Sequence, residues 1–414
     1  MGTAAEKRRG TDLSAMMGKI RAALFYAALT IEILVVLIDK SELVNPYESY
    51  IFRVTFALTV LVILLSERTW KEWVLLAAAV CVGLISYRVT GRNEILRIVL
   101  FVAACRDQSR EKMLKTAFWE TFTGCLVIFG LAVTGVFGNM TLTMLYRIDV
   151  GEETRYTLGF GHPNALHTMA FMLVVLGILS YHTKLRLPHY LCLFLLNAGL
   201  YLLTDSRTGT GITAAAILLA ALIAVQEKRA PAERAWRRKR WPYIAGSVIL
   251  LFCIGFSVWA ASMSYNLWII DANRIRWQRF LDEKLTGRIT DLYWGGSDHA
   301  DLPTWKLFSE PGAVRYFDMG WCRLFYWYGI VPALLTAAAL LWLIYRCRKT
   351  ADIASLWMVV ILCIYTVVEA HLISVYIGRN YLLLILGAAL AAAAAEGGGN
   401  RYGLPGLIIR EGTG

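Results

Sequence analysis

The sequence LLTDSRTGTG, residues 202–211, joins two apolar segments that are each long enough to cross a bilayer. This short connection carries an arginine, a carboxylate and several hydroxyl groups. Its glycines, Gly209 and Gly211, would let a bulky group approach the backbone. What the stretch does therefore depends on the fold around it and on the side of the membrane that it faces.

The composition is typical of a membrane protein. Of the 414 residues, 57% are hydrophobic and 17% are charged, and the mean hydropathy is +0.53. Soluble domains carry more charge than this. The apolar runs are too long for barrel strands and show no strand periodicity, so they predict an all-α, polytopic transmembrane helical bundle. We expect a single integral-membrane domain over residues 1–414.

About 12 segments have the apolar length that suits a membrane helix, although some are short or interrupted. They lie near residues 22–39, 50–65, 73–87, 95–105, 117–137, 164–181, 187–204, 210–226, 242–262, 321–345, 353–375 and 380–396. No small-residue cleavage site follows the first segment, so we expect a retained helix and not a signal peptide. The eight cysteines lie in or beside these segments and form no CxxC pair, which argues against a disulfide framework and a zinc site.

Lysine and arginine concentrate in alternate connections. With a cytoplasmic N-terminus, roughly 25 of the 42 Lys and Arg residues fall on the inner side. They include the basic loop of about residues 227–241, which lies directly against an apolar segment. The net charge of +12 is therefore interpreted as a topology signal, with both termini cytoplasmic, and not as nucleic-acid binding. The connection at 202–211, the stretch GFGHPN at 159–164 and the long loop of about 262–320 then face outward.

Two outward-facing arginines run against this charge bias. Arg207 lies at the start of the eighth segment and Arg379 at the start of the twelfth. Each would stand beside a helix N-terminus, whose free N–H groups and partial positive charge suit a phosphate. The alternatives are snorkelling to lipid headgroups and, for Arg207, an ion pair with Asp205. Asp205 or Ser206 is also a candidate cap for the eighth helix.

The stretch GFGHPN predicts the start of a helix. Pro163 fits the first helical position, which makes His162 the cap and Asn164 part of the helix-start motif. His162 and His167 are five residues apart and lie on different faces of that helix. Because a zinc site on one helix needs an i, i+4 pair, we expect no metal here.

Several residues are candidates for a general base on the outer face. Glu369 falls inside the eleventh segment, where a carboxylate is costly, so it either pairs with an arginine such as Arg379 or serves the substrate. The long loop adds five candidates: Asp298, His299, Asp301, Glu310 and Asp318. The same loop carries arginines that together favour a polyanionic ligand: Arg274, Arg276, Arg279, Arg288 and Arg315.

These motifs resemble a known family when they are taken in chain order. GFGHPN is followed by DSRTG at 205–209, by an outer loop with LTGRI at 285–289, and by FDMGWCRLFYWYGI at 317–330. This order resembles the O-antigen polymerase and O-antigen ligase superfamily, and within it the Wzy-type polysaccharide polymerases. The resemblance covers roughly residues 155–385, and the first five apolar segments contribute only hydropathy.

The resemblance implies a GT-C-like glycosyltransferase of the bacterial cytoplasmic membrane. Such enzymes act at the outer face on undecaprenyl-pyrophosphate-linked oligosaccharides, without a metal or other cofactor. Arginines would then replace a divalent cation at the pyrophosphate. By motif match this role falls on Arg207 and Arg288, and by position alone on Arg379 and Arg274.

A base near the acceptor sugar hydroxyl is also implied by the resemblance. FDMGWCRL departs from the family pattern at that point, so the base stays open among His299, Asp318 and Glu310. A positioned base contributes a rate factor of about 10²–10⁴. The sequence therefore predicts a metal-independent, inverting polymerase of surface polysaccharide, such as capsule. Its expected partners are the lipid-linked oligosaccharide, membrane lipids, and candidate flippase and chain-length regulator proteins.

Two other functions remain open from the sequence. An O-antigen-type ligase would share the donor chemistry and pass the finished glycan to another acceptor. A flippase of lipid-linked oligosaccharide, or another transporter, would also fit about 12 spans. Transporters usually place their polar features near the midplane and show two similar halves, whereas here the polar motifs gather on the outer face and no repeat is detected.

Overall fold

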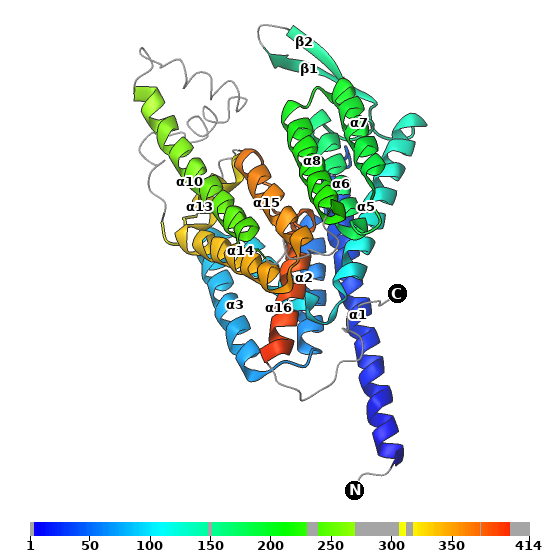
Figure 1. The fold of residues 1–414 in the computed structure, drawn as a ribbon, viewed down its shortest axis with the longest axis vertical. Coiled ribbons are helices and arrows are strands. Elements are labelled where there is room, and N and C mark those ends of the chain that lie inside the picture. The colour runs from blue at the N-terminus through cyan, green and yellow to red at the C-terminus, as the bar shows by residue number, and fades with distance from the viewer. Residues whose placement is uncertain are drawn as a thin grey trace.

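The computed structural model describes residues 4–147, 151–229, 239–269, 306–311, 318–372 and 374–397 (Figure 1). As the sequence predicts, the fold is almost entirely helical. In chain order its elements are α1 (Ala4–Lys40), α2 (Glu48–Leu64), α3 (Trp70–Thr90), α4 (Glu94–Ala104), η1 (Cys105–Asp107), α5 (Arg110–Val133), β1 (Thr141–Arg147), β2 (Gly151–Tyr156), α6 (Pro163–Tyr181), α7 (Leu187–Thr204), α8 (Arg207–Arg229), α10 (Trp241–Ile269), α13 (Gly320–Tyr328), α14 (Ile330–Thr350), α15 (Ile353–Val368), η3 (Ile377–Arg379) and α16 (Leu382–Gly397).

Within the described ranges, eight helices are long and apolar enough to cross a membrane. These are Ser14–Lys40 of α1, α3, α5, α6, α7, Arg207–Glu227 of α8, Trp241–Ala260 of α10, and α14. Two shorter apolar helices, Ile353–Val368 and Leu382–Glu396, accompany them. The multi-pass, α-helical character is thus confirmed, and all eight cysteines are free thiols, as expected.

Two of the predicted segments are interrupted. The segment predicted at 321–345 is divided into α13 and α14 at Gly329, whose φ of 93° is left-handed. A Cβ there would lie 2.5 Å from the backbone nitrogen of Ser309, so the backbone of the 306–311 segment packs directly against the break. In the segment predicted at 353–375 the helix ends at Val368, and the described residues 369–372 and 374–381 are irregular apart from η3. The prediction that Glu369 lies inside a membrane helix is therefore wrong.

The other difference is a β-hairpin. β1 and β2 pair antiparallel, with Thr141 opposite Tyr156 and a register shift between Leu145 and Arg147. The expectation that strand structure is absent is wrong for this stretch. Within the described residues these two strands pair with each other and project from one end of the bundle, at the top of Figure 1. For that reason hydropathy does not indicate them.

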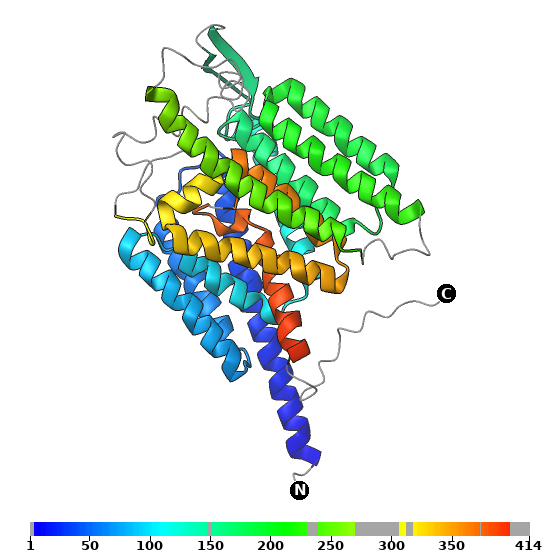
Figure 2. The same cartoon turned by 60° about the vertical axis from the view of Figure 1, so that its left-hand side comes forward.

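The helix directions place the connections at two opposite ends of the bundle. We call one the hairpin end, which comprises residues 41–47, 91–93, 134–147, 151–162, 205–206, 369–372 and 374–381. We call the other the basic end, which comprises residues 65–69, 105–109, 182–186 and 351–352. Contacts such as Arg21 Nη1 to Leu65 O at 3.1 Å and the Arg110–Asp352 ion pair hold the basic end together. Figure 2 shows α7, α8 and α10 inclined in the same direction.

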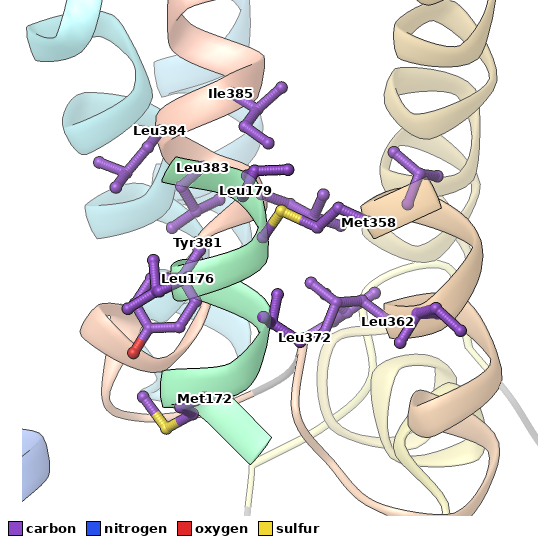
Figure 3. Close-up of a cluster of buried hydrophobic side chains, with 14 of the residues drawn as sticks. Met172, Leu176, Leu179, Met358, Leu362, Leu372, Tyr381, Leu383, Leu384 and Ile385 are labelled. Atoms are coloured by element: carbon purple, nitrogen blue, oxygen red, sulfur yellow. The ribbon is translucent and has the colours of Figure 1, made fainter. Parts of the chain in front are cut away.

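The core lies where α6, α15 and α16 meet. Figure 3 shows a single cluster of buried side chains from α6 (Met172, Leu176 and Leu179), α15 (Met358 and Leu362) and α16 (Leu383 and Ile385). α15 is buried on almost every face, which suits a central helix that is apolar all round. This core supports the irregular segment 369–381, which follows α15 directly and leads into α16.

Candidate functional site

The connection between α7 and α8 is a tight turn whose geometry the sequence explains. Asp205 ends α7 in the left-handed conformation, with φ 45° and ψ 31°, and its N–H donates to Tyr201 O at 2.8 Å. Aspartate tolerates this conformation better than most residues. The N–H of the buried Ser206 donates to Thr204 Oγ1 at 3.3 Å, and α8 starts at once with Arg207. Asp205 is therefore the C-terminal cap of α7 and not the N-terminal cap of α8.

The carboxylate of Asp205 faces two arginines. Arg155 of β2 approaches Asp205 Oδ2 through Nη2 at 3.0 Å, and the same nitrogen lies 2.6 Å from Glu153 Oε2. Arg207 Nε lies 3.7 Å from Asp205 Oδ1. The side chain of Arg207 is 58% exposed, whereas that of Arg155 is 13% exposed. Arg207 thus presents its guanidinium group outward beside a carboxylate.

A buried histidine fastens this turn to α6. His167 is fully buried, with Nε2 3.0 Å from Asn197 Oδ1 and Nδ1 3.3 Å from Thr204 Oγ1. Asn197 Nδ2 in turn donates to Thr210 O at 3.1 Å. A Cβ on Gly209 would lie 2.8 Å from the His167 ring, so this glycine faces the bundle interior. Of the two glycines expected to admit a ligand, only Gly211 has open space around its Cβ position.

The predicted helix start at 162–164 is confirmed. His162 caps α6, its Nδ1 accepts from Asn164 N at 3.1 Å, and Pro163 takes the first helical position. Burial, and next the positive charge of Arg155, lower the pKa of His162. The preceding Gly161 donates to Lys40 O at 3.0 Å, which ties this turn to the end of α1.

A second charged cluster lies beside the end of α1. Lys40 is 2.8 Å from Asp39 and within electrostatic range of Arg379 and Glu369. His371 is fully buried between the rings of Phe171 and Tyr365 and within range of Arg379 and Lys40. We define these residues as the α1-end cluster: Asp39, Lys40, Glu369, His371 and Arg379.

The positions of Glu369 and Arg379 differ from those that the sequence suggests. Glu369 is the residue after α15 and has extended backbone, with φ −143° and ψ 141°. Arg379 is the last residue of the short η3 helix. The next residue, Asn380, accepts through Oδ1 from Leu382 N at 3.2 Å, where α16 begins. Arg379 is therefore held by irregular backbone and not by the first turn of a membrane helix.

Two acidic candidates of the long loop fall among the described residues. A Cβ on Gly320 would lie 2.9 Å from Glu369 O, and Asp318 is two residues away from that glycine, so Asp318 and Glu369 belong to the same region. Glu310 is 43% exposed and forms an ion pair with Lys306. His299, Arg274 and Arg288 lie outside the described residues.

The described residues contain no group of three or more His, Cys, Asp or Glu side chains that could hold a metal ion. What they do assemble, at the hairpin end, is a set of cations with carboxylates among them. The cations are Lys40, Arg155, Arg207 and Arg379. Sequence reasoning missed Lys40 and Arg155, because their relevance depends on contacts between residues far apart in the chain.

Comparison with known proteins adds no further constraint: no protein-family model, curated protein or solved structure matches this chain. What the site can do follows from its own chemistry. Guanidinium and ammonium groups that stand near one another favour an anion with several oxygens, such as a phosphate or pyrophosphate. Carboxylates in the same region can accept a proton.

Proposed function

We propose that this chain is a polysaccharide polymerase that joins lipid-pyrophosphate-linked oligosaccharide repeat units. The observation that carries the proposal is the exposed guanidinium of Arg207 at the same end of the bundle as Arg379 and Lys40. Cations held in place before the reaction stabilise a leaving group on which negative charge develops. The order of motifs from GFGHPN to FDMGWCRLFYWYGI supports the same function.

In the proposed reaction the anomeric carbon of the donor sugar exchanges one oxygen for another. Its bond to the pyrophosphate oxygen breaks, and the bonding electrons leave with the pyrophosphate. A bond forms to the hydroxyl oxygen of the acceptor repeat unit, and the hydroxyl proton passes to a carboxylate, Glu369 or Asp318. A single displacement of this kind inverts the anomeric configuration. No metal takes part, since Arg207 and Arg379, together with Arg274 and Arg288 of the long loop, are proposed to neutralise the pyrophosphate.

The proposed orientation places the hairpin end outside the cell and both termini in the cytoplasm of a bacterium. It is supported by the arginines and lysines at the basic end, including Arg21, Arg106 and Arg110. Cytoplasmic connections carry an excess of such residues. The lipid carrier is then proposed to be undecaprenyl pyrophosphate, reached from the outer leaflet.

Transport of a lipid-linked glycan is a second candidate function, and one observation favours it. The irregular residues 369–372 and 374–381 lie between two short apolar helices, and non-helical backbone that lines a cavity is common in transporters. Against it, the cations gather at one end and not midway along the helices. A ligase would share every feature of the donor site, so it differs from a polymerase only in its acceptor.

The test is to delete the gene and determine the size and leaflet of the lipid-linked glycan that accumulates. A single repeat unit on the outer leaflet supports the polymerase. Long chains that remain on the lipid would replace the proposal with a ligase. A single unit confined to the inner leaflet would replace it with a flippase, and an unchanged glycan profile would refute all three.

A further inference from the structure

A buried ion pair links three helices, α1, α2 and α4, near the hairpin end. Arg97 of α4 is 3% exposed and Glu32 of α1 is fully buried, and Arg97 Nη2 lies 3.0 Å from Glu32 Oε1 and 3.2 Å from Oε2. Thr55 of α2 donates its hydroxyl to Glu32 Oε1 at 2.7 Å. The Arg97 guanidinium also lies 3.7 Å from the centre of the Phe52 ring. The pair is thus fully enclosed and cannot itself meet a substrate.

The second nitrogen of the same guanidinium holds the irregular segment. Arg97 Nη1 donates to Val375 O at 2.9 Å, across 278 positions of sequence. The next residue, Tyr376, packs its ring 6.0 Å from that of Phe52 and donates its hydroxyl to Glu48 Oε2 at 3.1 Å. Arg97 therefore clamps segment 374–381 against α1, α2 and α4.

Close backbone packing completes the clamp. A Cβ on Gly378 would lie 2.5 Å from Glu32 O, so the turn of η3 rests directly on the backbone of α1. Arg379 is the next residue, so this contact fixes the backbone that carries it. Asn380 Nδ2 donates to Leu372 O at 3.2 Å and closes the segment from the other side.

We propose that Arg97, held by Glu32, is a positioning residue that fixes Arg379 in the α1-end cluster. The inference rests on the proposed function only where it concerns activity, because the positioning itself can be measured without it. A buried ion pair is expensive to desolvate and is often replaceable by apolar residues when it serves stability alone. Arginine suits the role because its planar group reaches a carboxylate and a carbonyl at once, which lysine does not do.

The first experiment measures position directly. Hydrogen–deuterium exchange of the purified full-length protein is followed for peptides that cover 369–381, in the wild type and in Arg97→Gln. We expect at least tenfold faster exchange in these peptides and no change in peptides from α7 or α10. Gly378→Ala, which disturbs the same contact without removing a charge, should give the same local pattern.

The control is another arginine–glutamate pair. Arg346 is 6% exposed and forms two hydrogen bonds of 2.8 Å to Glu396, near the end of α16. Arg346→Gln should leave exchange in 369–381 unchanged. Two outcomes would show that Arg97 is a general stabilising residue and that the proposal is wrong. In the first, Arg97→Gln speeds exchange throughout the protein. In the second, Arg97→Gln is lost from the membrane and Gly378→Ala leaves exchange in 369–381 unchanged.

The second experiment measures the coupling between Arg97 and Arg379 by the rate at which variants restore the glycan in a deletion strain. We expect at least a tenfold loss for Arg97→Gln, and no more than about a twofold further loss when it is added to Arg379→Gln, because residues that act through one another are not additive. Losses that multiply would overturn the proposal. If the wild-type chain restores no glycan but the variants still show the local change in exchange, the positioning role stands and the polymerase proposal is refuted.

Discussion

The carboxylate of Asp205 lies 3.0 Å from the guanidinium of Arg155, so the α7–α8 turn is tied to the β-hairpin. Arg155 also lies 2.6 Å from Glu153, which means that two carboxylates already balance its charge. Arg207, at 3.7 Å from Asp205 and more than half exposed, is balanced less closely. Of the two arginines at this turn, Arg207 is therefore the one more available to an anionic ligand.

Arg207→Lys tests whether this arginine recognises a phosphate group through its planar fork. Lysine keeps the charge but loses the paired N–H donors, so we expect activity to fall by about 10- to 100-fold, roughly 1.4–2.7 kcal/mol. Membrane abundance should not change, because exposed substitutions rarely alter stability by more than about 0.5 kcal/mol. Arg53, an exposed arginine of α2 that lies over the Tyr50 ring, provides the matched control. Full activity of Arg207→Ala would refute the pyrophosphate site.

Asp205→Asn separates the charge of this residue from its backbone role. Asparagine adopts the left-handed conformation readily, so the turn should form, and the thermal unfolding midpoint should fall only by the small contribution of the lost ion pairs. A partly exposed ion pair contributes about 0.2–1 kcal/mol, so we expect less than a tenfold loss of activity. Asp205→Ala should also lower the unfolding midpoint, because φ 45° strains alanine. Equal midpoints for the two variants would contradict this account.

Three carboxylates can be compared as candidate bases. Glu369→Gln and Asp318→Asn remove groups that Gly320 brings into one region, and the true base should cost a factor of about 10²–10⁴. Glu310→Gln should cost least, since Glu310 is exposed and paired with Lys306. Initial rates of glycan extension by each purified variant provide the measurement. The largest loss in Glu310→Gln would assign the base to Glu310 instead.

His162 should make the protein less stable as the pH falls. Its pKa is lowered from the ordinary value of 6.5 by burial and then by Arg155, so the unfolded chain takes up a proton before the folded one does. The contribution of His162 to the free energy of unfolding is therefore fully present above pH 6.5, and it declines as the pH drops toward the lowered pKa. Protonation of Nδ1 would also remove the acceptor that caps Asn164 N.

The measurement for His162 is the thermal unfolding midpoint in detergent at pH 7.5 and at pH 5.5. Asparagine caps helices well and does not titrate, so His162→Asn should match the wild type at pH 7.5 and lose less on acidification. His182, near the basic end, provides a comparison, and His182→Asn should keep the wild-type pH dependence. An equal loss in His162→Asn and the wild type would show that another group is responsible.

The helical architecture could be predicted from sequence because the signal is local. Every apolar segment identified from hydropathy overlaps a helix, and the Pro163 motif placed the start of α6 at the right residue. These features depend on side chains that are neighbours in the chain. Hydropathy does not distinguish helical from irregular backbone once both are enclosed by protein, and for that reason the end of α15 and the position of Glu369 were missed.

The composition of the candidate site could be predicted only in part. Arg207 and Arg379 were identified because they break the charge bias of their surroundings. Arg155 was not, since its partner Asp205 is 50 positions away, and no local pattern marks that pairing. Lys40 was missed for a similar reason. In the sequence it is the ordinary end of a membrane helix, and only the structure places η3 beside α1.

Gly209 and Gly211 lie within one turn of α8, and they allow a role in packing to be distinguished from a role in ligand approach. A methyl group on Gly209 would meet the His167 ring at 2.8 Å and Ser206 Oγ at 3.0 Å, whereas one on Gly211 meets nothing within 4 Å. We expect Gly209→Ala to destabilise the protein by about 1–3 kcal/mol through overpacking. Gly211→Ala should be neutral or stabilising by up to about 1 kcal/mol, because alanine favours helix. The unfolding midpoints of the two variants test this, and their activities test the alternative. If Gly209 served the approach of a ligand and not the packing of His167, Gly209→Ala would lose activity while its midpoint stayed at the wild-type value.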